Sequence, residues 1–334
     1  MKRTKFLACL LMLTVLLPEN KVEAQPVKSK PVNLIFDTDI GPDYDDVGAM
    51  AVLHALADSG KVKILATMAS NQSKYSASVM DVLNTYFKRP DIPIGVIRGK
   101  AVNMVAWQKW DSILVKNYPH SIKNNAQAED ALTLYRKILA AQPDGSVTIV
   151  TVGFTTNMAD LLLSKSDKYS PLDGRNLILK KVKKLVCMAG RFPEGKEFNV
   201  DRDPVSSKIV FDSWPTQIIF SGFEIGMLVH TGLPITKNEM IKNSPVKDAF
   251  SISIPMDKND SLGRMSWDET AVLVAINGFD AYYTVNEGRF ICLEDGSNKW
   301  NSNGKGHFYL VQKMPVPQIE DVLNKLIEHQ PKNK

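Results

Sequence analysis

The sequence predicts an α/β fold with an open, mostly parallel central sheet and helices on both faces, arranged as a single domain. Short apolar runs alternate along the chain with longer segments of helical periodicity, which is typical of consecutive strand–helix–strand units. Several of the short runs are almost wholly apolar, as expected for strands buried on both faces of a sheet. No internal repeat, heptad array or low-complexity tract interrupts this alternation.

Each predicted element rests on its own local pattern. Residues 32–39 form an apolar run of strand length, and residues 45–60 have helical periodicity, with Asp45 or Asp46 at the N-cap and Gly60 at the end. The further strands are predicted at 62–70, 91–99, 146–153, 183–190 and 216–222. The further helices are predicted at 73–89, 128–142 and 155–165.

Two segments depart from this alternation. Residues 100–126, which include Trp107, Trp110 and Tyr118, have poor periodicity and are predicted to form a loop or lid. Residues 284–313 contain two strand-like runs and are predicted to form a β-rich appendage before a final helix.

The first 24 residues have the pattern of a secretory signal peptide. Basic residues precede an apolar stretch at 6–17, and a small-x-small sequence ends at Ala24. The apolar stretch is shorter than the roughly 20 residues of a membrane span, and Cys9 lies too early in it for a lipoprotein. We therefore expect cleavage after Ala24, a catalytic domain over residues 25–334, and secretion, to the periplasm if the source is a Gram-negative bacterium.

The charge and the cysteine content argue against a nucleic-acid-binding, membrane-surface-binding or disulfide-bonded protein. The whole chain carries a formal net charge of +5, and removal of the leader takes away four basic and two acidic residues, which leaves +3. This charge is too small to indicate binding to nucleic acid or to a membrane surface. About 310 residues remain, enough for one large α/β domain or two small ones. Cys187 and Cys292 lie in apolar runs and are expected to be buried free thiols rather than a disulfide.

Acidic and polar residues gather where the predicted strands end. Ligand sites in open parallel sheets lie outside the carboxyl ends of the strands. The first strand leads into five closely spaced aspartates: Asp37, Asp39, Asp43, Asp45 and Asp46. Later strand ends and one helix start add further candidates: Asn71, Val152, Glu197, Asn199, Asp203 and Asp268. We expect these segments to form one site.

Carboxylates this close together repel one another unless a cation joins them. Oxygen ligands without His or Cys suit Ca²⁺ or Mg²⁺, and six to eight oxygens suit Ca²⁺ best. The histidines lie away from these segments, which disfavours zinc: His54, His120, His230, His307 and His329. In the alternative interpretation, Asp45 and Asp46 only cap a helix and the other aspartates are solvated.

The Asp37-x-Asp39 pattern also occurs in haloacid-dehalogenase-like phosphatases. In that class Asp37 would be the nucleophile and Asp39 the acid. The class also needs a phosphate-binding lysine and a late acidic pair at a strand end. The sequence offers no convincing late pair, so this interpretation is disfavoured.

Four segments together resemble the inosine-uridine-preferring nucleoside hydrolases. DTDIGPDYDDVGAM at 37–50 resembles the Asp-rich signature of that family, in the form with two extra residues before the Asp pair. VTVGFTTNMA at 150–159, KEFNVDRDP at 196–204 and WDETAVLVA at 267–275 are similar to its later motifs and stand in the same order. The resemblance covers most of the chain and implies the same open α/β fold.

The resemblance implies a metal site and a general base. Asp39 would bind Ca²⁺ and take a proton from the attacking water. Asp46, Asp268 and the main-chain carbonyl of Val152 would be the other protein ligands. The implied reaction is hydrolysis of the N-ribosidic bond of a ribonucleoside to free base and ribose, through an oxocarbenium-like state. From a different class, the alternative is a catalytically silent, calcium-dependent sugar- or nucleoside-binding protein.

The resemblance also implies which residues contact the substrate. Asp45, Asn71, Glu197 and Asn199 match ribose-contacting positions. Trp267 stands where one branch of the family has His and the purine-preferring branch has Trp, so stacking on a purine is implied, although a core role is an open alternative. The expected partner is a small ribonucleoside rather than a nucleic acid, and either a homodimer or a homotetramer is compatible with the family.

Overall fold

The computed structural model describes residues 30–332, and residues 31–332 of this range belong to one compact unit. The predicted signal peptide, its cleavage after Ala24 and Cys9 lie outside the described residues. Cys187 and Cys292 are both buried and free, as the sequence predicts. Within residues 30–332, no helix is both long enough and apolar enough to cross a membrane.

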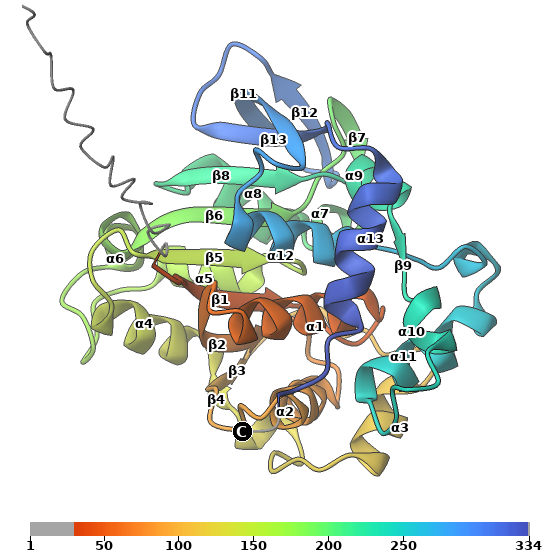
Figure 1. Ribbon diagram of the computed structural model, residues 1–334. Helices are drawn as coiled ribbons and strands as arrows, with labels where there is room; N and C mark the ends of the chain where they lie inside the picture. The colour runs from red at the N-terminus through yellow and green to blue at the C-terminus, as the bar shows by residue number, and fades with distance from the viewer. Residues whose placement is uncertain (1–29, 333–334) are drawn as a thin grey trace, which may run out of the picture. The chain divides into compact units, whose positions relative to one another are not determined.

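A mixed sheet forms the centre of the described unit (Figure 1). Within residues 30–332 it has eleven strands in the order β4-β3-β2-β1-β5-β6-β8-β13-β11-β12-β7, and a separate pair joins β9 and β10. The strands from β4 to β13 in this order are parallel, whereas β11, β12 and β7 continue the sheet antiparallel. The bounds are β1 (Val32–Thr38), β2 (Val62–Ala69), β3 (Ile94–Val96), β4 (Glu129–Asp130), β5 (Val147–Thr151), β6 (Val182–Met188), β7 (Glu194–Lys196), β8 (Gln217–Ser221), β9 (His230–Thr231), β10 (Arg264–Met265), β11 (Tyr283–Cys292), β12 (Ser297–Asn301) and β13 (His307–Gln312).

Strand β1 shows how the sheet divides the core. Its side chains alternate between the two faces, so Leu34 and Phe36 pack in one apolar cluster and Ile35 in the other. All three are fully buried. This explains why residues 34–36 of β1 are continuously apolar instead of alternating.

Helices cover both faces. In Figure 1, α1, α12 and α13 lie in front of the sheet, and α5 and α8 lie behind it. The helix bounds are α1 (Asp45–Asp58), α2 (Ser76–Tyr86), α3 (Trp110–Asn117), α4 (Ala131–Ala141), α5 (Thr156–Leu163), α6 (Gly174–Lys181), α7 (Phe198–Arg202), α8 (Pro204–Ser213), α9 (Phe223–Leu228), α10 (Leu233–Lys237), α11 (Pro245–Ser253), α12 (Trp267–Asn277) and α13 (Val316–Ile327). Helices α1 and α12 are buried along nearly their whole length and contact each other.

The predicted open α/β fold is confirmed, with two local corrections. The segment 100–126 is not all loop, because it contains α3, whose first residue Trp110 is fully buried. The segment 284–313 is not a separate appendage, because β13 pairs in parallel with β8 inside the main sheet. A strand that joins the main sheet and a strand of an independent hairpin have the same local pattern, so periodicity could not distinguish the two.

The predicted cap of α1 is also wrong. Asp45 and Asp46 are the first two helical residues, and the N-cap is Tyr44, whose side chain makes no capping hydrogen bond. Both carboxylates are buried, with exposed fractions of 3% and 1%. The interpretation that Asp45 and Asp46 serve only as helix caps is therefore excluded.

Candidate active site

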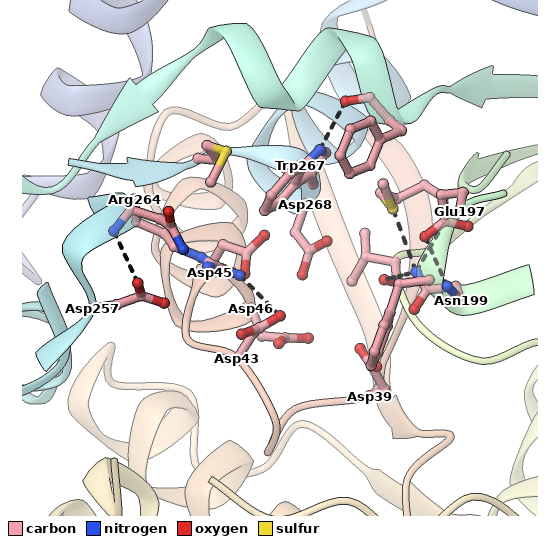
Figure 2. A pocket seen from close by; sticks show the side chains of 16 residues that line it. Asp39, Asp43, Asp45, Asp46, Glu197, Asn199, Asp257, Arg264, Trp267 and Asp268 are labelled. Carbon is pink, nitrogen blue, oxygen red and sulfur yellow. Dashed lines mark hydrogen bonds and ion pairs between the residues drawn. The ribbon is translucent and has the colours of Figure 1, made fainter. Parts of the chain in front are cut away.

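A pocket opens at the carboxyl ends of β1, β5, β6 and β8, the edge of the sheet where the sequence predicts a ligand site. Its volume is about 320 Å³. Figure 2 shows Asp39, Asp45, Asp46 and Asp268 between Arg264 on one side and Glu197 and Asn199 on the other. Of the site residues that the resemblance implies, all but Asn71 line this pocket: Asp39, Asp45, Asp46, Val152, Glu197, Asn199, Trp267 and Asp268.

Asp37, the sixth residue of strand β1, points away from the pocket. Its carboxylate accepts hydrogen bonds from Tyr135 Oη at 2.9 Å, Asn157 Nδ2 at 2.8 Å and Thr151 Oγ1 at 3.3 Å. Burial raises the pKa of Asp37 to about 7, although these three donors oppose the rise. A fully enclosed carboxyl that does not line the pocket cannot act as the nucleophile of a phosphatase, and instead anchors the end of β1.

Asp39 begins the loop that leaves β1. Asn71 fixes this loop from behind, because its Nδ2 donates to the Asp39 carbonyl at 3.0 Å and to the Met104 carbonyl at 2.8 Å. Gly153 allows the close approach of the opposite loop, since a Cβ there would lie 2.3 Å from the Asp39 nitrogen. Burial, followed by repulsion from Asp46, raises the pKa of Asp39 well above its ordinary value.

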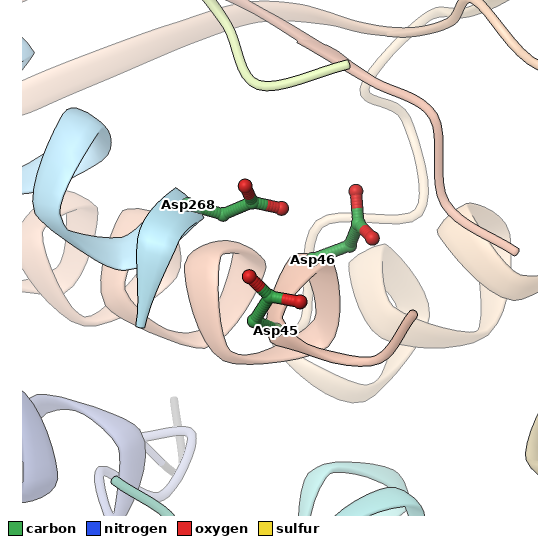
Figure 3. Close-up of side chains that lie close together, drawn as sticks. All are labelled: Asp45, Asp46 and Asp268. Atoms are coloured by element: carbon green, nitrogen blue, oxygen red, sulfur yellow. The ribbon is translucent and has the colours of Figure 1, made fainter. Parts of the chain in front are cut away.

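Three carboxylates from two helices converge in the pocket. Asp45 and Asp46 begin α1, Asp268 is the second residue of α12, and Figure 3 shows all three pointing into one space. One oxygen from each lies within 4.8 Å of the others. Asp46 also accepts a hydrogen bond from Thr38 Oγ1. Asp39 is not part of this closest group, although it lines the same pocket.

The donor set fits a hard divalent cation. Burial, followed by repulsion from Asp45, raises the pKa values of Asp46 and Asp268 well above the ordinary range. Buried like charges at this spacing are unfavourable unless a cation neutralises them. Among the described pocket residues there is no His or Cys, so the available ligands are oxygens, which suit Ca²⁺ or Mg²⁺ rather than zinc.

Arg264, on β10, is a pocket residue that the sequence did not indicate. Its Nε and Nη2 donate to Asp45 Oδ1 at 3.2 and 3.0 Å, and Nη2 also lies 2.9 Å from Asp43 Oδ2. Burial raises the pKa of Asp45 to about 6, while the Arg264 charge opposes that rise. A single arginine on a two-residue strand has no spacing signature, so nothing in the pattern could have revealed it.

Glu197 and Asn199 form the opposite wall. The Glu197 carboxylate caps α7 by accepting from the backbone N–H groups of Asn199 at 2.7 Å and Val200 at 3.2 Å, and it also accepts from Gly190 N–H at 3.1 Å. Burial raises the pKa of Glu197 to about 7, and these hydrogen bonds oppose the rise. Asn199 Nδ2 donates to the Val152 carbonyl at 2.9 Å, and that carbonyl keeps a second lone pair for a ligand.

Trp267 is both a wall of the pocket and a packed side chain. Its Nε1 donates to the Phe223 carbonyl at 2.8 Å, and its ring centroid lies 5.3 Å from that of Phe223. Gly226 is needed beneath it, since a Cβ there would lie 2.3 Å from the Trp267 Cα. Trp107, which is 54% exposed, and the buried Trp110 do not line the pocket.

The model of the family described as inosine-uridine preferring nucleoside hydrolase matches residues 34–309, well over half of the chain. The chain belongs to this family. Nucleoside hydrolases are N-ribohydrolases that act on N-glycosyl compounds, and their substrates are small-molecule nucleosides. The resemblance predicted from four short motifs is therefore confirmed over most of the sequence.

Solved structures share the nucleoside hydrolase fold. A plant nucleoside hydrolase is similar with a TM-score of 0.67 and 19% identity, over 89% of this chain and 99% of its own. A purine-preferring ribonucleoside hydrolase from Gardnerella vaginalis gives 0.69 and 16%, over 89% and 98%. An inosine-uridine preferring nucleoside hydrolase from Bacillus anthracis gives 0.68 and 14%, over 89% and 99%. No curated protein matches the chain.

One predicted site residue of this nucleoside hydrolase does not join the others. Asn71 is fully buried and is absent from the pocket wall, and its Oδ1 also accepts from Met104 N–H at 2.9 Å. Its amide thus ties two loops together. Besides Arg264, several wall residues were not predicted as site residues: Asp257, Asn259, Met188, Phe198, Phe223 and Met265.

Proposed function

We propose that this nucleoside hydrolase cleaves the N-ribosidic bond of ribonucleosides with the help of Ca²⁺, and that Asp39 is the general base. Asp39, Asp46, Asp268 and the Val152 carbonyl would hold the ion. The observation that carries this proposal is the convergence of buried carboxylates in one pocket whose described wall contains one basic side chain, Arg264. That arginine is already paired with Asp45 and Asp43.

A bound Ca²⁺ would supply Lewis acidity and a fixed point of attachment for the sugar hydroxyls. Asp39 lines the pocket beside this acidic group and is suited to accept a proton from water as it attacks C1′. The hydrogen bond from Asn199 Nδ2 to the Val152 carbonyl fixes the loop that follows β5. This narrows the space in which the attacking water can lie.

The opposite wall supports the charge that develops on the sugar. Glu197 is held rigid by three backbone donors, so its oxygens need no reorganisation during the reaction. A carboxylate in that position adds negative potential near an oxocarbenium-like ribosyl group. Asp45, with Oδ1 held by Arg264, retains Oδ2 to accept a ribose hydroxyl.

We also propose that the base is a purine, which stacks on Trp267. The half-buried indole forms one wall of the pocket, and stacking needs only an aromatic face. No His stands next to Asp268 in the sequence, so the leaving base would be protonated at N7 from solvent, a route that pyrimidines lack.

A panel of ribonucleosides tests this function directly. The protein is incubated with inosine, guanosine, uridine and cytidine in the presence of Ca²⁺, and free base and reducing sugar are measured. We expect both products in equal amounts, with a higher kcat/KM for inosine or guanosine than for the pyrimidines. Binding without any release of base would instead support the catalytically silent alternative.

The remaining proposal concerns export. We propose that residues 1–24 are a signal peptide and that the mature enzyme spans residues 25–334 and is secreted, to the periplasm in a Gram-negative host. N-terminal sequencing of protein recovered outside the cytoplasm should begin at Gln25. Recovery of the intact N-terminus from the cytoplasm alone would refute export.

A further inference from the structure

The Arg264 guanidinium contacts several carboxylates and an aromatic ring. Its side chain is buried, with the residue 6% exposed, and two of its nitrogens donate to the same oxygen of Asp45. Nη2 also pairs with Asp43 at 2.9 Å, and Nη1 lies 3.8 Å from Asp260. The guanidinium carbon stands 5.2 Å from the ring centroid of Tyr44.

The same guanidinium also contacts Trp267, the first residue of α12. Its carbon stands 5.2 Å from the ring centroid of Trp267, so it lies against two aromatic rings. Tyr44 Oη donates to Asp260 at 2.5 Å, which completes a network between the acidic loop and the segment before α12. A side chain fixed by this many contacts holds a defined orientation, and therefore fixes the orientation of Asp45 as well.

Asp45 has two possible partners, the bound cation and Arg264. Asp45 belongs to the group of three carboxylates whose oxygens lie within 4.8 Å of one another, so on geometry alone it could bind the same cation as Asp46 and Asp268. Arg264 competes for Asp45 through two hydrogen bonds and neutralises its charge. The cation is then left to the remaining carboxylates.

We propose that Arg264 is a positioning residue that reserves Asp45 for the substrate and keeps it out of the metal shell. The positive charge of Arg264 takes the place of a second cation beside Asp45, so a single divalent ion is bound with moderate affinity. The second oxygen of Asp45 is then directed to a sugar hydroxyl. The part of this inference that concerns the sugar rests on the proposed function. The part that concerns the metal does not depend on any reaction.

The metal part is tested by calorimetric titration of Ca²⁺ into the metal-free protein. Arg264→Gln removes a positive charge beside the carboxylates and frees Asp45 to bind the ion. We expect the Kd for Ca²⁺ to fall by about fivefold or more, because the attraction between a divalent ion and the site increases when a buried cation is removed. Structural damage alone would weaken Ca²⁺ binding instead.

Two further variants separate charge from geometry. Arg264→Lys keeps the charge but loses the planar fork that grips Asp45. We expect its Kd for Ca²⁺ to stay within about twofold of wild type, while KM for the cleaved ribonucleoside rises about tenfold or more with a smaller change in kcat. Arg264→Gln combined with Asp43→Asn removes one carboxylate along with the arginine, and should bind Ca²⁺ more weakly than Arg264→Gln alone.

The matched control is Arg136→Gln. Arg136 is also a buried arginine, 2% exposed, and it pairs with Asp167 at 2.9 Å outside the pocket. This variant should lose stability without changing the Kd for Ca²⁺ or the KM. It therefore measures what the loss of any buried arginine does to this protein.

The inference is overturned if folded Arg264→Gln binds Ca²⁺ as wild type does, or more weakly. If Arg264→Gln does not fold, Arg264→Lys is the deciding variant. An unchanged KM for the ribonucleoside, or a fivefold change in the Kd for Ca²⁺, in that variant contradicts the inference. Failure of the proposed function gives a different result. In that case wild type releases no base from any ribonucleoside, while the Kd of the Arg264 variants still tests the metal part.

Discussion

At the scale of single residues, five neighbouring aspartates have different environments. Asp37 and Asp39 are two positions apart, which in a continuing strand would place them on the same face. Strand β1 ends at Thr38, however, so Asp39 turns into the pocket while Asp37 stays under the sheet with Tyr135. The sequence predicts that the cluster is chemically active, but only the exact end of the strand decides which aspartates face the ligand.

Replacement of Asp39 by Asn tests the general base. Asn keeps the size of the side chain and one ligand oxygen, but it cannot accept a proton from water. We expect kcat on inosine to fall by about 100-fold or more, in the range typical of general bases, with circular dichroism unchanged. Asp81→Asn is the control, because it alters another buried carboxylate outside the pocket, and it should keep activity near wild type. Activity of Asp39→Asn within about tenfold of wild type would exclude the assignment.

Replacement of Trp267 tests how the base leaves. If stacking helps to spread the charge of the leaving purine, Trp267→Ala should lower kcat on inosine more than it raises KM. Trp267→Phe, which keeps an aromatic face, should recover part of that loss. Trp107→Ala, an exposed tryptophan outside the pocket, should have no effect. A Trp267→Ala protein with a lower melting temperature and normal kcat would show that the residue only packs.

At the scale of elements, the site depends on the contact between α1 and α12. Each helix has an acidic pair in its first turn, Asp45-Asp46 and Asp268-Glu269, where the helix dipole favours negative charge. Gly48 permits the close approach, since a Cβ there would lie 2.1 Å from Glu269 Oε1. The apolar character of both helices is visible in the sequence. Their mutual contact is not, because it depends on tertiary packing between segments more than 200 residues apart.

His54 on α1 makes the packing of this element depend on pH. It is fully buried, its ring stacks on Phe87 at 4.6 Å, and its Nε2 lies 3.0 Å from Asn84 Oδ1. Burial, followed by the Arg89 charge, lowers the pKa of His54 to about 3 from 6.5. The unfolded state therefore binds the proton first as pH falls, so the stability that His54 contributes is present above pH 6.5 and is lost progressively toward pH 3.

Between pH 7 and pH 5 we expect this single group to remove roughly 2 kcal/mol of unfolding free energy. The measurement is urea unfolding of wild type and His54→Gln at both pH values. The difference between the two proteins should change by about that amount, while His120→Gln, a half-buried control, should follow wild type. An identical pH dependence in His54→Gln and wild type would show that His54 is not responsible.

At the scale of the whole molecule, the sequence predicted the main architecture because central parallel strands such as β1 and β5 are buried and therefore largely apolar. Because these strands are parallel, the segments that follow them lie at one edge of the sheet. The sequence could not predict α3, the position of β13 inside the main sheet, or the role of Asn71 as a tie between loops. Those features depend on long-range pairing rather than on local periodicity.

Hydrolysis by this protein should depend on Ca²⁺. The purified protein is stripped with EDTA, its metal content is measured by elemental analysis, and release of base from inosine is followed as Ca²⁺ is added back. We expect activity to disappear on chelation and to return in proportion to bound Ca²⁺, up to one ion per chain, because the buried carboxylates need a cation to lie together. Full activity after exhaustive chelation, or stoichiometric zinc in the active protein, would contradict the account.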